Sequence, residues 1–360
     1  MSEHHGWADL PEGLLHSVVA LSGSFSDLFA FSLTCRSWRT AFSSYPSKAT
    51  FSTLLPPLLL QPDVAVITPC HLPFAPKRPC RVTDLASQRS RLRCQIPLGS
   101  FCFTGASYGQ LIFSSNGSCL LVDVFTGLSV SPPQLPDNNR SKLYYGALTA
   151  PLASPNSHLL VSTSSRSFFW RVGSLFWRSS CNETIKQIVT FKGQLFGTDS
   201  GGRLFTLHLT PQIRIHQMAG FWGESTSTGK RLVNLCLVAC GDMLILIRSR
   251  GSFPARGDTF EALRLDQSTD NAKFVKVEEL GNWAIFISTD ERSQPLSLMN
   301  PERWGGKSNC IYCYSHDSEH WTAFELGKPA SDPSIFVFIS SGGMVQPMWV
   351  VPSMFFSRCL

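Results

Sequence analysis

The sequence predicts an α+β multidomain chain: a small module of three short helices, followed by a mainly-β domain that forms a degenerate β-propeller. A pair of β-sandwiches is the competing architecture for the second part. Three observations carry this prediction. A helical stripe of apolar residues opens the chain, within the first fifty residues. From about residue 94, short apolar runs alternate with turn signals. Gly and Pro number 26 and 23 among 360 residues, and Phe (26) far exceeds Tyr (6), which is typical of aromatic strands joined by many turns.

The first helix is expected to begin at Leu10-Pro11. Proline is favoured in the first helical turn because its missing N–H would have no partner there. Four branched apolar residues then follow at helical spacing, namely Leu14, Leu15, Val18 and Val19. Gly23 breaks the pattern and ends the helix.

Two further short helices are expected before residue 46. Ser24 and Asp27 match a capping box, in which the N-cap side chain and the side chain three residues later satisfy free backbone N–H groups. A third helix follows from about Cys35 and ends near Tyr45. Helices this short are not stable alone, so the module either caps the main domain or docks on another protein.

The pattern Leu10-Pro11-x-x-Leu14-Leu15, then Asp27-Leu28, then Cys35-Arg36-x-Trp38-Arg39 resembles the F-box motif over residues 7–46. In that family the module docks on a Skp-type adaptor of SCF ubiquitin ligases and thereby reaches the cullin. The resemblance implies seven adaptor-binding residues, which are Leu10, Pro11, Leu14, Leu15, Val18, Leu28 and Phe31. It also implies that Trp38 and Cys35 belong to the module's own core.

Residues 47–93 are expected to form a Pro-rich and basic linker. Eight prolines between residues 46 and 80 exclude a long helix. Six cations and one anion lie between residues 77 and 93, so this segment alone supplies +5 of the formal net charge of +6. It is either a nuclear-import or anion-binding patch, or the charge that keeps an edge strand from aggregating, and we favour the second. The rest of the chain is nearly neutral, which argues against a nucleic-acid partner.

Residues 94–356 are expected to form the β-rich, kelch-like domain. Asn116-Gly117 between two apolar runs is a strong hairpin signal. Similar strand–turn–strand units recur around Gly201-Gly202, Gly241-Asp242 and after Trp283, at irregular spacing. At the usual repeat length of about 40–50 residues, this domain has room for about five to seven blades.

The order of several short motifs supports a second resemblance. After the F-box-like segment come Val122-Asp123-x-x-Thr126-Gly127, Arg264-Leu265-Asp266, Val277-x-x-Leu280-Gly281 and Ala284-Ile285-Phe286-Ile287. Together they resemble the plant F-box proteins with a C-terminal domain of unknown function 295, the KIB type. The resemblance covers nearly the whole chain and implies a kelch-like β domain, without a settled chemistry.

The sequence lacks the familiar catalytic and phosphate-binding motifs, so we expect no enzyme and no cofactor. The first twelve residues lack the apolar core of a signal peptide, and no apolar run approaches the roughly 18 residues that span a bilayer. We therefore expect a soluble protein of the cytoplasm, the nucleus or both, with reduced cysteines among its 12.

Two local patterns need separate interpretation. Cys310-x-x-Cys313-x-x-His316-x-x-x-His320 carries four zinc-type ligands, but a strand there would point Cys310 and Cys313 to opposite faces, so we expect no metal site. Arg303 and Trp304 precede two glycines in a long turn. They are a candidate partner-binding pair, or else the Trp304 ring fills a gap between blades.

The function predicted from these features is that of a substrate-recognition adaptor of an SCF-type ubiquitin ligase. The β domain would bind an unknown protein target, and no membrane or nucleic acid is involved. Two alternatives remain: a propeller-fold enzyme or small-molecule-binding module, and a degenerate F-box protein that no longer joins a ligase.

Overall fold

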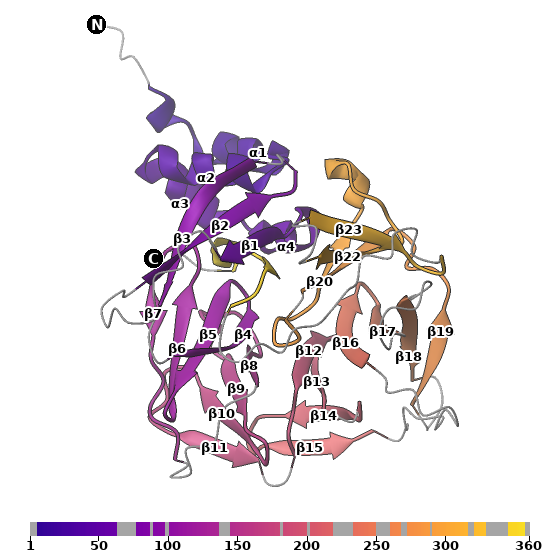
Figure 1. Ribbon diagram of the computed structural model, residues 1–360. Coiled ribbons are helices and arrows are strands. Elements are labelled where there is room, and N and C mark those ends of the chain that lie inside the picture. The colour runs from indigo at the N-terminus through magenta and orange to yellow at the C-terminus, as the bar shows by residue number, and fades with distance from the viewer. Residues whose placement is uncertain are drawn as a thin grey trace, which may run out of the picture.

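The structure is a computed structural model of the chain (Figure 1). It describes residues 6–62, 77–86, 89–97, 101–136, 145–180, 183–199, 202–218, 233–249, 260–267, 272–288, 290–315, 320–328 and 345–356. A group of short helices opens the chain, and a β-propeller follows it, as the sequence predicts. No helix in these ranges is long and apolar enough to cross a lipid bilayer.

The N-terminal helices follow the predicted order. They are η1 (Trp7–Asp9), α1 (Glu12–Leu21), α2 (Phe25–Thr34), α3 (Arg36–Ser44), η2 (Lys48–Thr50) and α4 (Phe51–Leu54). Pro11 immediately precedes α1, and the Ser24 side chain accepts a hydrogen bond from the Asp27 N–H at 3.1 Å, which caps α2. We refer to η1 and α1–α3 together as the helical module.

The described strands form six four-stranded sheets, the blades of the propeller. Blade 1 holds β24 (Met348–Val350), β1 (Leu58–Pro62), β2 (Lys77–Asp84) and β3 (Arg89–Pro97). Blade 2 holds β4 (Cys102–Ser107), β5 (Gln110–Ser115), β6 (Ser118–Asp123) and β7 (Ser129–Val130). Blade 3 holds β8 (Tyr145–Leu148), β9 (His158–Ser162), β10 (Ser167–Arg171) and β11 (Trp177–Ser180).

Blade 4 holds β12 (Gln187–Phe191), β13 (Gln194–Thr198), β14 (Leu204–His208) and β15 (Arg214–Gln217). Blade 5 holds β16 (Val233–Cys240), β17 (Met243–Ser249), β18 (Phe260–Asp266) and β19 (Lys273–Val277). Blade 6 holds β21 (Leu296–Met299), β20 (Trp283–Ile287), β22 (Cys310–Ser315) and β23 (His320–Glu325). The short helices η3 (Pro301–Trp304) and η4 (Ser353–Phe355) complete the described elements.

Blade 1 closes the ring by joining the two ends of the chain. β24 pairs antiparallel with β1, so that Leu58 lies opposite Val350 and Leu60 opposite Met348. All four of these side chains are buried. Closure of this kind removes two free strand edges and ties the C-terminal segment to the N-terminal strands.

The predicted linker is therefore partly a blade. Within residues 47–93, β1, β2 and the start of β3 are strands of the propeller. The prolines are compatible with strands here because Pro62 ends β1, and because Pro79 lies just past the last residue of β2 that pairs with β1, so it pairs with β3 alone. β3 is the outer edge of blade 1, where the edge-charge interpretation expects cations. Of the six cations, Arg81 is exposed, and the side chains of the other five lie outside the described residues.

Blade 6 departs from the strand order of blades 2–5. Its first strand, β20, takes the second place in the sheet, and the later strand β21 takes the end place. β20 consequently pairs antiparallel with β21 but parallel with β22. The loop between β20 and β21 crosses to blade 2, where Ser293 bridges to Ala106 and Arg292 donates a hydrogen bond to the Phe103 carbonyl at 2.5 Å.

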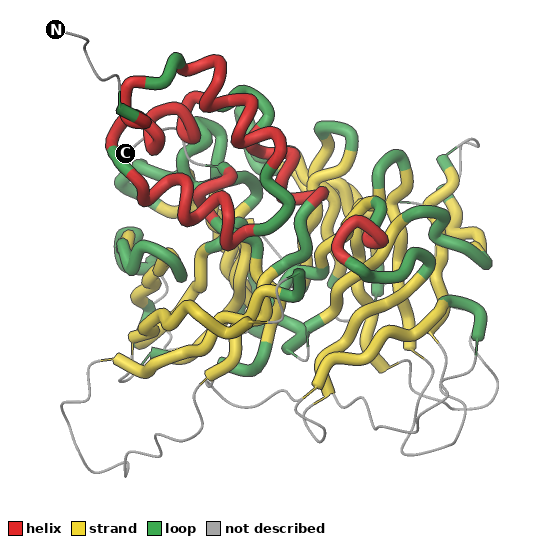
Figure 2. Tube along the Cα trace, turned by 90° about the horizontal axis from the view of Figure 1, so that it is seen from above, coloured by secondary structure: helices red, strands yellow, loops and turns green. Residues whose placement is uncertain are grey.

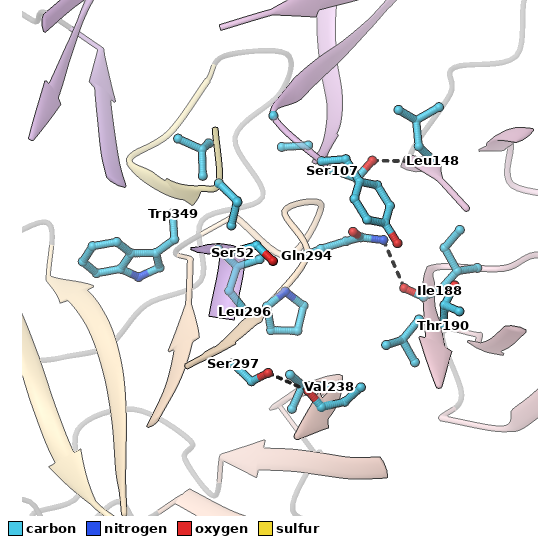
Figure 3. A pocket seen from close by; sticks show the side chains of 18 of the residues that line it. Ser52, Ser107, Leu148, Ile188, Thr190, Val238, Gln294, Leu296, Ser297 and Trp349 are labelled. Atoms are coloured by element: carbon cyan, nitrogen blue, oxygen red, sulfur yellow. Dashed lines mark hydrogen bonds between the residues drawn. The ribbon is translucent and has the colours of Figure 1, made fainter. Parts of the chain in front are cut away.

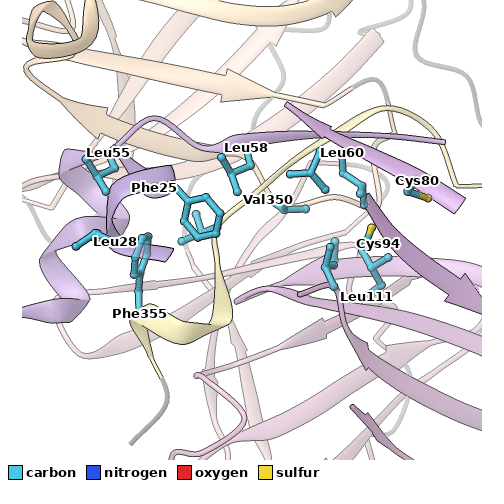
Figure 4. Close-up of a cluster of buried hydrophobic side chains, with 14 of the residues drawn as sticks. Phe25, Leu28, Leu55, Leu58, Leu60, Cys80, Cys94, Leu111, Val350 and Phe355 are labelled. Atoms are coloured by element: carbon cyan, nitrogen blue, oxygen red, sulfur yellow. The ribbon is translucent and has the colours of Figure 1, made fainter. Parts of the chain in front are cut away.

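The helical module and blade 1 share one hydrophobic core (Figure 4). The Phe25 ring on α2 lies 5.5 Å from the Phe125 ring and 6.3 Å from the Phe355 ring, measured between centroids. The Ser26 hydroxyl donates a hydrogen bond to the Asp84 carboxylate at 3.1 Å. Figure 2 shows the helices gathered on one side of the molecule, over the strands. The module is thus packed on the propeller, as short helices require.

Candidate functional site

Helix α1 carries two neighbouring apolar stripes, one buried and one exposed. Leu15 and Val19, four residues apart, point into the shared core and are 1% and 0% exposed. Leu14, Val18 and Leu21 lie on another side and are 55%, 42% and 86% exposed. Positions i, i+4 and i+7 fall on one face of a helix, so these three side chains form a continuous stripe, which we call the outer stripe. An amphipathic surface helix normally presents polar residues there.

The seven sequence-predicted adaptor-binding residues divide between these two environments. Leu14, Val18 and Pro11 are exposed, and Leu10 is half-buried. The other three point inward and are 5% exposed or less, namely Leu15, Leu28 and Phe31. In this structure, those three side chains stabilise the module and are not available to a partner at its surface. Leu21, which is exposed in the outer stripe, is not among the seven, although its spacing from Leu14 is readable in the sequence.

Trp38 and Cys35 lie between the helices of the module. The Trp38 ring is half-buried at 4.6 Å from the Phe31 ring, and its indole N–H donates to the Trp7 carbonyl at 2.9 Å. Trp38 therefore holds η1 against α3. The Cys35 thiol lies 3.1 Å from the Ser37 hydroxyl, and this hydrogen bond lowers the pKa of the thiol.

A second candidate site is a cavity of about 270 Å³ on the propeller axis (Figure 3). At least one strand from every blade lines it, namely β4, β8, β12, β16, β21 and β24, with Gln110 of β5 and Leu195 of β13, and α4 contributes Ser52 and Thr53. The cavity is therefore enclosed by the whole ring, with α4 in its wall. It was missed at the sequence level because residues from six separate blades create it.

Hydrogen bonds inside the chain already occupy much of the polar lining of this axial cavity. The Gln294 amide donates to the Ile188 carbonyl at 3.1 Å, and the Ser297 hydroxyl donates to the Ala239 carbonyl at 2.6 Å. The Ser107 hydroxyl accepts a hydrogen bond from the Leu148 N–H at 2.7 Å. Burial raises the pKa of Tyr108, another lining residue. The described lining contains hydroxyl, amide and apolar groups and no charged side chain.

The six blades and their closure by β24 can be compared with known proteins. A family model described as "KIB1-4 beta-propeller" matches residues 82–338. The chain belongs to this family. The match starts inside β2 and covers all the blades that follow, so it confirms that the predicted β domain is a propeller of the KIB type.

Solved structures similar to this KIB1-4 β-propeller include several other propellers. The N-terminal domain of Nup159 is 8% identical, with 65% of each chain covered and a TM-score of 0.36. A regucalcin from Agrobacterium tumefaciens is 13% identical, with 73% of this chain and 79% of that one covered and a TM-score of 0.34. The Cps50 (Swd1) propeller from Myceliophteria thermophila is 12% identical, with 69% and 74% covered and a TM-score of 0.33. The chain spans less than two thirds of the Nup159 domain. No curated protein matches the sequence.

In this KIB1-4 propeller, Trp304 is largely a packing residue. Its half-buried ring lies 6.3 Å from the Phe286 ring and 5.8 Å from the Tyr312 ring, within the core of blade 6. A Cβ on Gly306 would approach the Trp304 ring to 2.5 Å, so a glycine is needed beside it. Arg303, next to it, is exposed. Of the candidate partner-binding pair, Arg303 is therefore exposed to a partner, whereas Trp304 packs within blade 6.

Strand β22 places the two cysteines of the zinc-type pattern on opposite faces of the sheet. Cys310 packs in one core cluster, with Tyr312, and Cys313 packs in another, with Ile311. This is the alternation that β22 imposes. His316 and the His320 side chain lie outside the described residues. Among the described residues, no three His, Cys, Asp or Glu side chains gather as metal ligands would.

Proposed function

We propose that this KIB1-4 propeller is a substrate-recognition adaptor of an SCF-type ubiquitin ligase, acting in the cytoplasm, the nucleus or both. In this proposal the helical module is an F-box that docks on a Skp-type adaptor, and through it on a cullin, while the propeller binds a protein target. The transfer chemistry then belongs to other subunits. The observation that carries the proposal is the outer stripe of Leu14, Val18 and Leu21.

The outer stripe has the form of a helix anchor for a hydrophobic groove. Helices that bind in grooves present apolar side chains at i, i+3 or i+4, and i+7, and the outer stripe supplies i, i+4 and i+7. Fully burying one Leu or Val side chain contributes roughly 1.5–3 kcal/mol. Three such side chains on one rigid helix therefore supply a substantial part of a specific interface.

The packing of the module also supports this role. Leu15 and Val19 fix α1 to the core from the inner side, and the His16 imidazole lies 3.0 Å from the Ala41 carbonyl of α3. The outer stripe is consequently held in place before any partner arrives. Binding of a partner then costs little conformational entropy, because the outer stripe is already ordered.

The test is co-purification of the full chain with a Skp-type adaptor, using a double substitution in the outer stripe. Leu14→Asp with Val18→Asp places two charges where the groove requires apolar groups, and we expect a loss of binding of at least about 100-fold. Both side chains are exposed, so the melting temperature should stay close to that of the wild type. Leu28→Asp is unsuitable, because Leu28 is fully buried and its replacement would unfold the module.

Leu175→Asp is the matched control. The Leu175 side chain is 81% exposed in a turn of blade 3, and this variant should bind the adaptor normally. Undiminished binding by the folded double variant would reject the outer stripe as the docking face. A folded wild-type chain that fails to bind would instead assign the helices a purely structural role, as in a degenerate F-box protein.

The axial cavity favours a second candidate function, binding of a small molecule. Its volume of about 270 Å³ is just below the range for ligand sites, which begins at roughly 300 Å³, so only a small ligand would fit. An enzyme of general acid–base type would need converging titratable groups, and the described lining offers only the Tyr108 phenol. Soaking or thermal-shift screening with uncharged fragments tests this candidate.

A further inference from the structure

The turn between β10 and β11 exposes two adjacent apolar side chains at the rim of blade 3. Leu175 is 81% exposed and Phe176 is 71% exposed. Single exposed apolar residues are ordinary, but two neighbours at one tip form a local patch. The turn follows Trp170, which is buried between blades 2 and 3, so the patch stands on a rigid base.

Hydrogen bonds fix the shape of this turn. The Trp170 indole N–H donates to the Ser174 carbonyl at 2.9 Å, and the Ser174 hydroxyl donates to the Phe176 carbonyl at 3.0 Å. Gly173 has a φ of +83°, a conformation that favours glycine. The Trp177 indole N–H donates to the Pro133 carbonyl and ties the strand after the turn to the neighbouring blade. The two apolar side chains are therefore presented in an ordered conformation, as binding anchors usually are.

Two arginines flank the apolar pair. In the β10–β11 register, Phe169 lies opposite Arg178 and Trp170 lies opposite Trp177, where the pairing ends. Alternation along the strands puts Arg171 and Arg178 on the same face of the blade as Phe169. Arg171 is the last residue of β10 and Phe176 immediately precedes β11, so one arginine lies on either side of the turn. Both arginines are exposed, and their guanidinium groups donate to backbone carbonyls, Arg171 to Pro155 at 3.4 Å and Arg178 to Pro211 at 3.0 Å.

The charge of the described parts of blades 3 and 4 is strongly unbalanced. The described residues 145–180, 183–199 and 202–218 contain seven cations, namely Arg166, Arg171, Arg178, Lys186, Lys192, Arg203 and Arg214. They contain only two anions, Glu183 and Asp199, and both lie within 4 Å of Arg203. Burial, with the charges of Arg171 and Arg178, also lowers the pKa of His158. In these ranges, no carboxylate pairs with Arg171 or Arg178.

We propose that the Leu175-Phe176 turn, with Arg171 and Arg178, docks an acidic segment of a partner protein that carries at least one apolar side chain. The proposal names the class of target for the target-binding half of the proposed function, and it rests on that half. The apolar pair supplies the desolvated anchor, and the guanidinium groups bind carboxylates on either side of it. The patch is two side chains wide, which suits a short peptide segment.

The experiment measures fluorescence anisotropy of a labelled peptide with the full chain. The probe is a short Glu-rich peptide containing one Phe and one Leu, and the comparison peptide has Gln in place of every Glu. We expect the Glu peptide to bind, the Gln peptide to bind at least about tenfold more weakly, and the affinity to fall as salt rises. Failure of the Glu peptide to bind overturns the proposal.

Three variants locate the site. Arg171→Glu with Arg178→Glu, and separately Phe176→Asp, should each weaken the Glu peptide by at least about tenfold. Lys328→Glu reverses an exposed charge on blade 6 and should leave binding unchanged. All the substituted side chains are exposed, and a melting curve checks that each variant is folded. Equal binding by all of the folded variants would place the peptide elsewhere and overturn the proposal.

Two further measurements distinguish peptide docking at this turn from membrane binding and from adaptor binding. Sedimentation with phosphatidylserine-containing vesicles should leave the chain in the supernatant, and Phe176-dependent pelleting would assign the turn to a membrane instead. The Leu14→Asp, Val18→Asp variant should keep full peptide affinity, because the outer stripe lies on α1 and the turn on blade 3. Loss of adaptor binding and loss of peptide binding are thus scored independently.

Discussion

At the scale of single residues, burial decides the chemistry of the cysteines. Of the nine described cysteines, Cys102 is exposed and Cys35 is half-buried, while the others are buried. Desolvation raises the pKa of Cys119, Cys236 and Cys240 to about 12 in each case. Only the thiolate is a good nucleophile, so these three thiols are unreactive in the folded chain.

We therefore predict an ordered alkylation pattern with iodoacetamide at pH 9. Cys35 and Cys102 should be labelled in the native protein, while Cys119, Cys236 and Cys240 should be labelled only after urea is added, as peptide mass spectrometry can show. The same rise in the cysteine pKa values also sets how the free energy of unfolding depends on pH. The folded pKa exceeds the unfolded value of about 9, so the stabilisation is complete below that pH and is lost as the pH rises toward 12. Labelling of Cys236 in the native protein as fast as that of Cys35 or Cys102 would contradict this account.

At the scale of elements, the turns and helices are the parts that the sequence predicts best. Asn116 and Gly117 have φ values of +48° and +81°, the left-handed pair that an Asn-Gly hairpin requires. Tyr108-Gly109 adopts the same pair of conformations, although tyrosine gives no such signal. The closing blade was not predicted, because the partner of β1 is β24, far along the chain, and local periodicity carries no trace of it. The inserted β21 in blade 6 was missed although it pairs with the preceding strand β20, because its four residues are too few to give a clear strand pattern.

Two glycine turns give a matched test of how the β4–β5 hairpin is held. A Cβ on Gly109 would lie 2.5 Å from the Ser353 nitrogen, whereas a Cβ on Gly117 would meet nothing within 4 Å. Both have positive φ, so Gly117→Ala should cost about 1–2 kcal/mol from backbone strain alone. Gly109→Ala should cost clearly more, because the C-terminal segment must also move. Urea unfolding of both variants measures the difference, and equal costs would show that the clash relaxes freely.

At the scale of the whole molecule, the helical module and the propeller form one packed unit. Phe25 of α2 meets Phe125 of blade 2 and Phe355 after β24, and Phe51 of α4 also meets Phe355. The sequence predicted a helical module and a propeller, but their common core depends on contacts between residues more than three hundred positions apart. Burial at this junction also explains why Leu28 and Phe31 point inward while the outer stripe stays exposed.

The shared core makes a prediction about removing the helices. Deleting residues 1–50 takes away Phe25, Leu28 and Phe42 and uncovers Phe355 and Leu58, so the truncated chain should melt at a lower temperature and tend to aggregate. Phe25→Ala tests the same contact within the full chain and should cost about 3–5 kcal/mol in urea unfolding. Leu14→Asp with Val18→Asp, at two exposed side chains of α1, should leave the unfolding midpoint nearly unchanged. If the truncated chain melts like the full chain, the junction contributes no stability and the two parts fold separately.

The stability of the truncated chain also decides what its binding can show. If the truncated chain is destabilised as expected, its failure to bind an adaptor would say nothing about the docking face, since folding and binding would be lost together. The point substitutions in the outer stripe are then the measurement that separates a docking helix from a structural one.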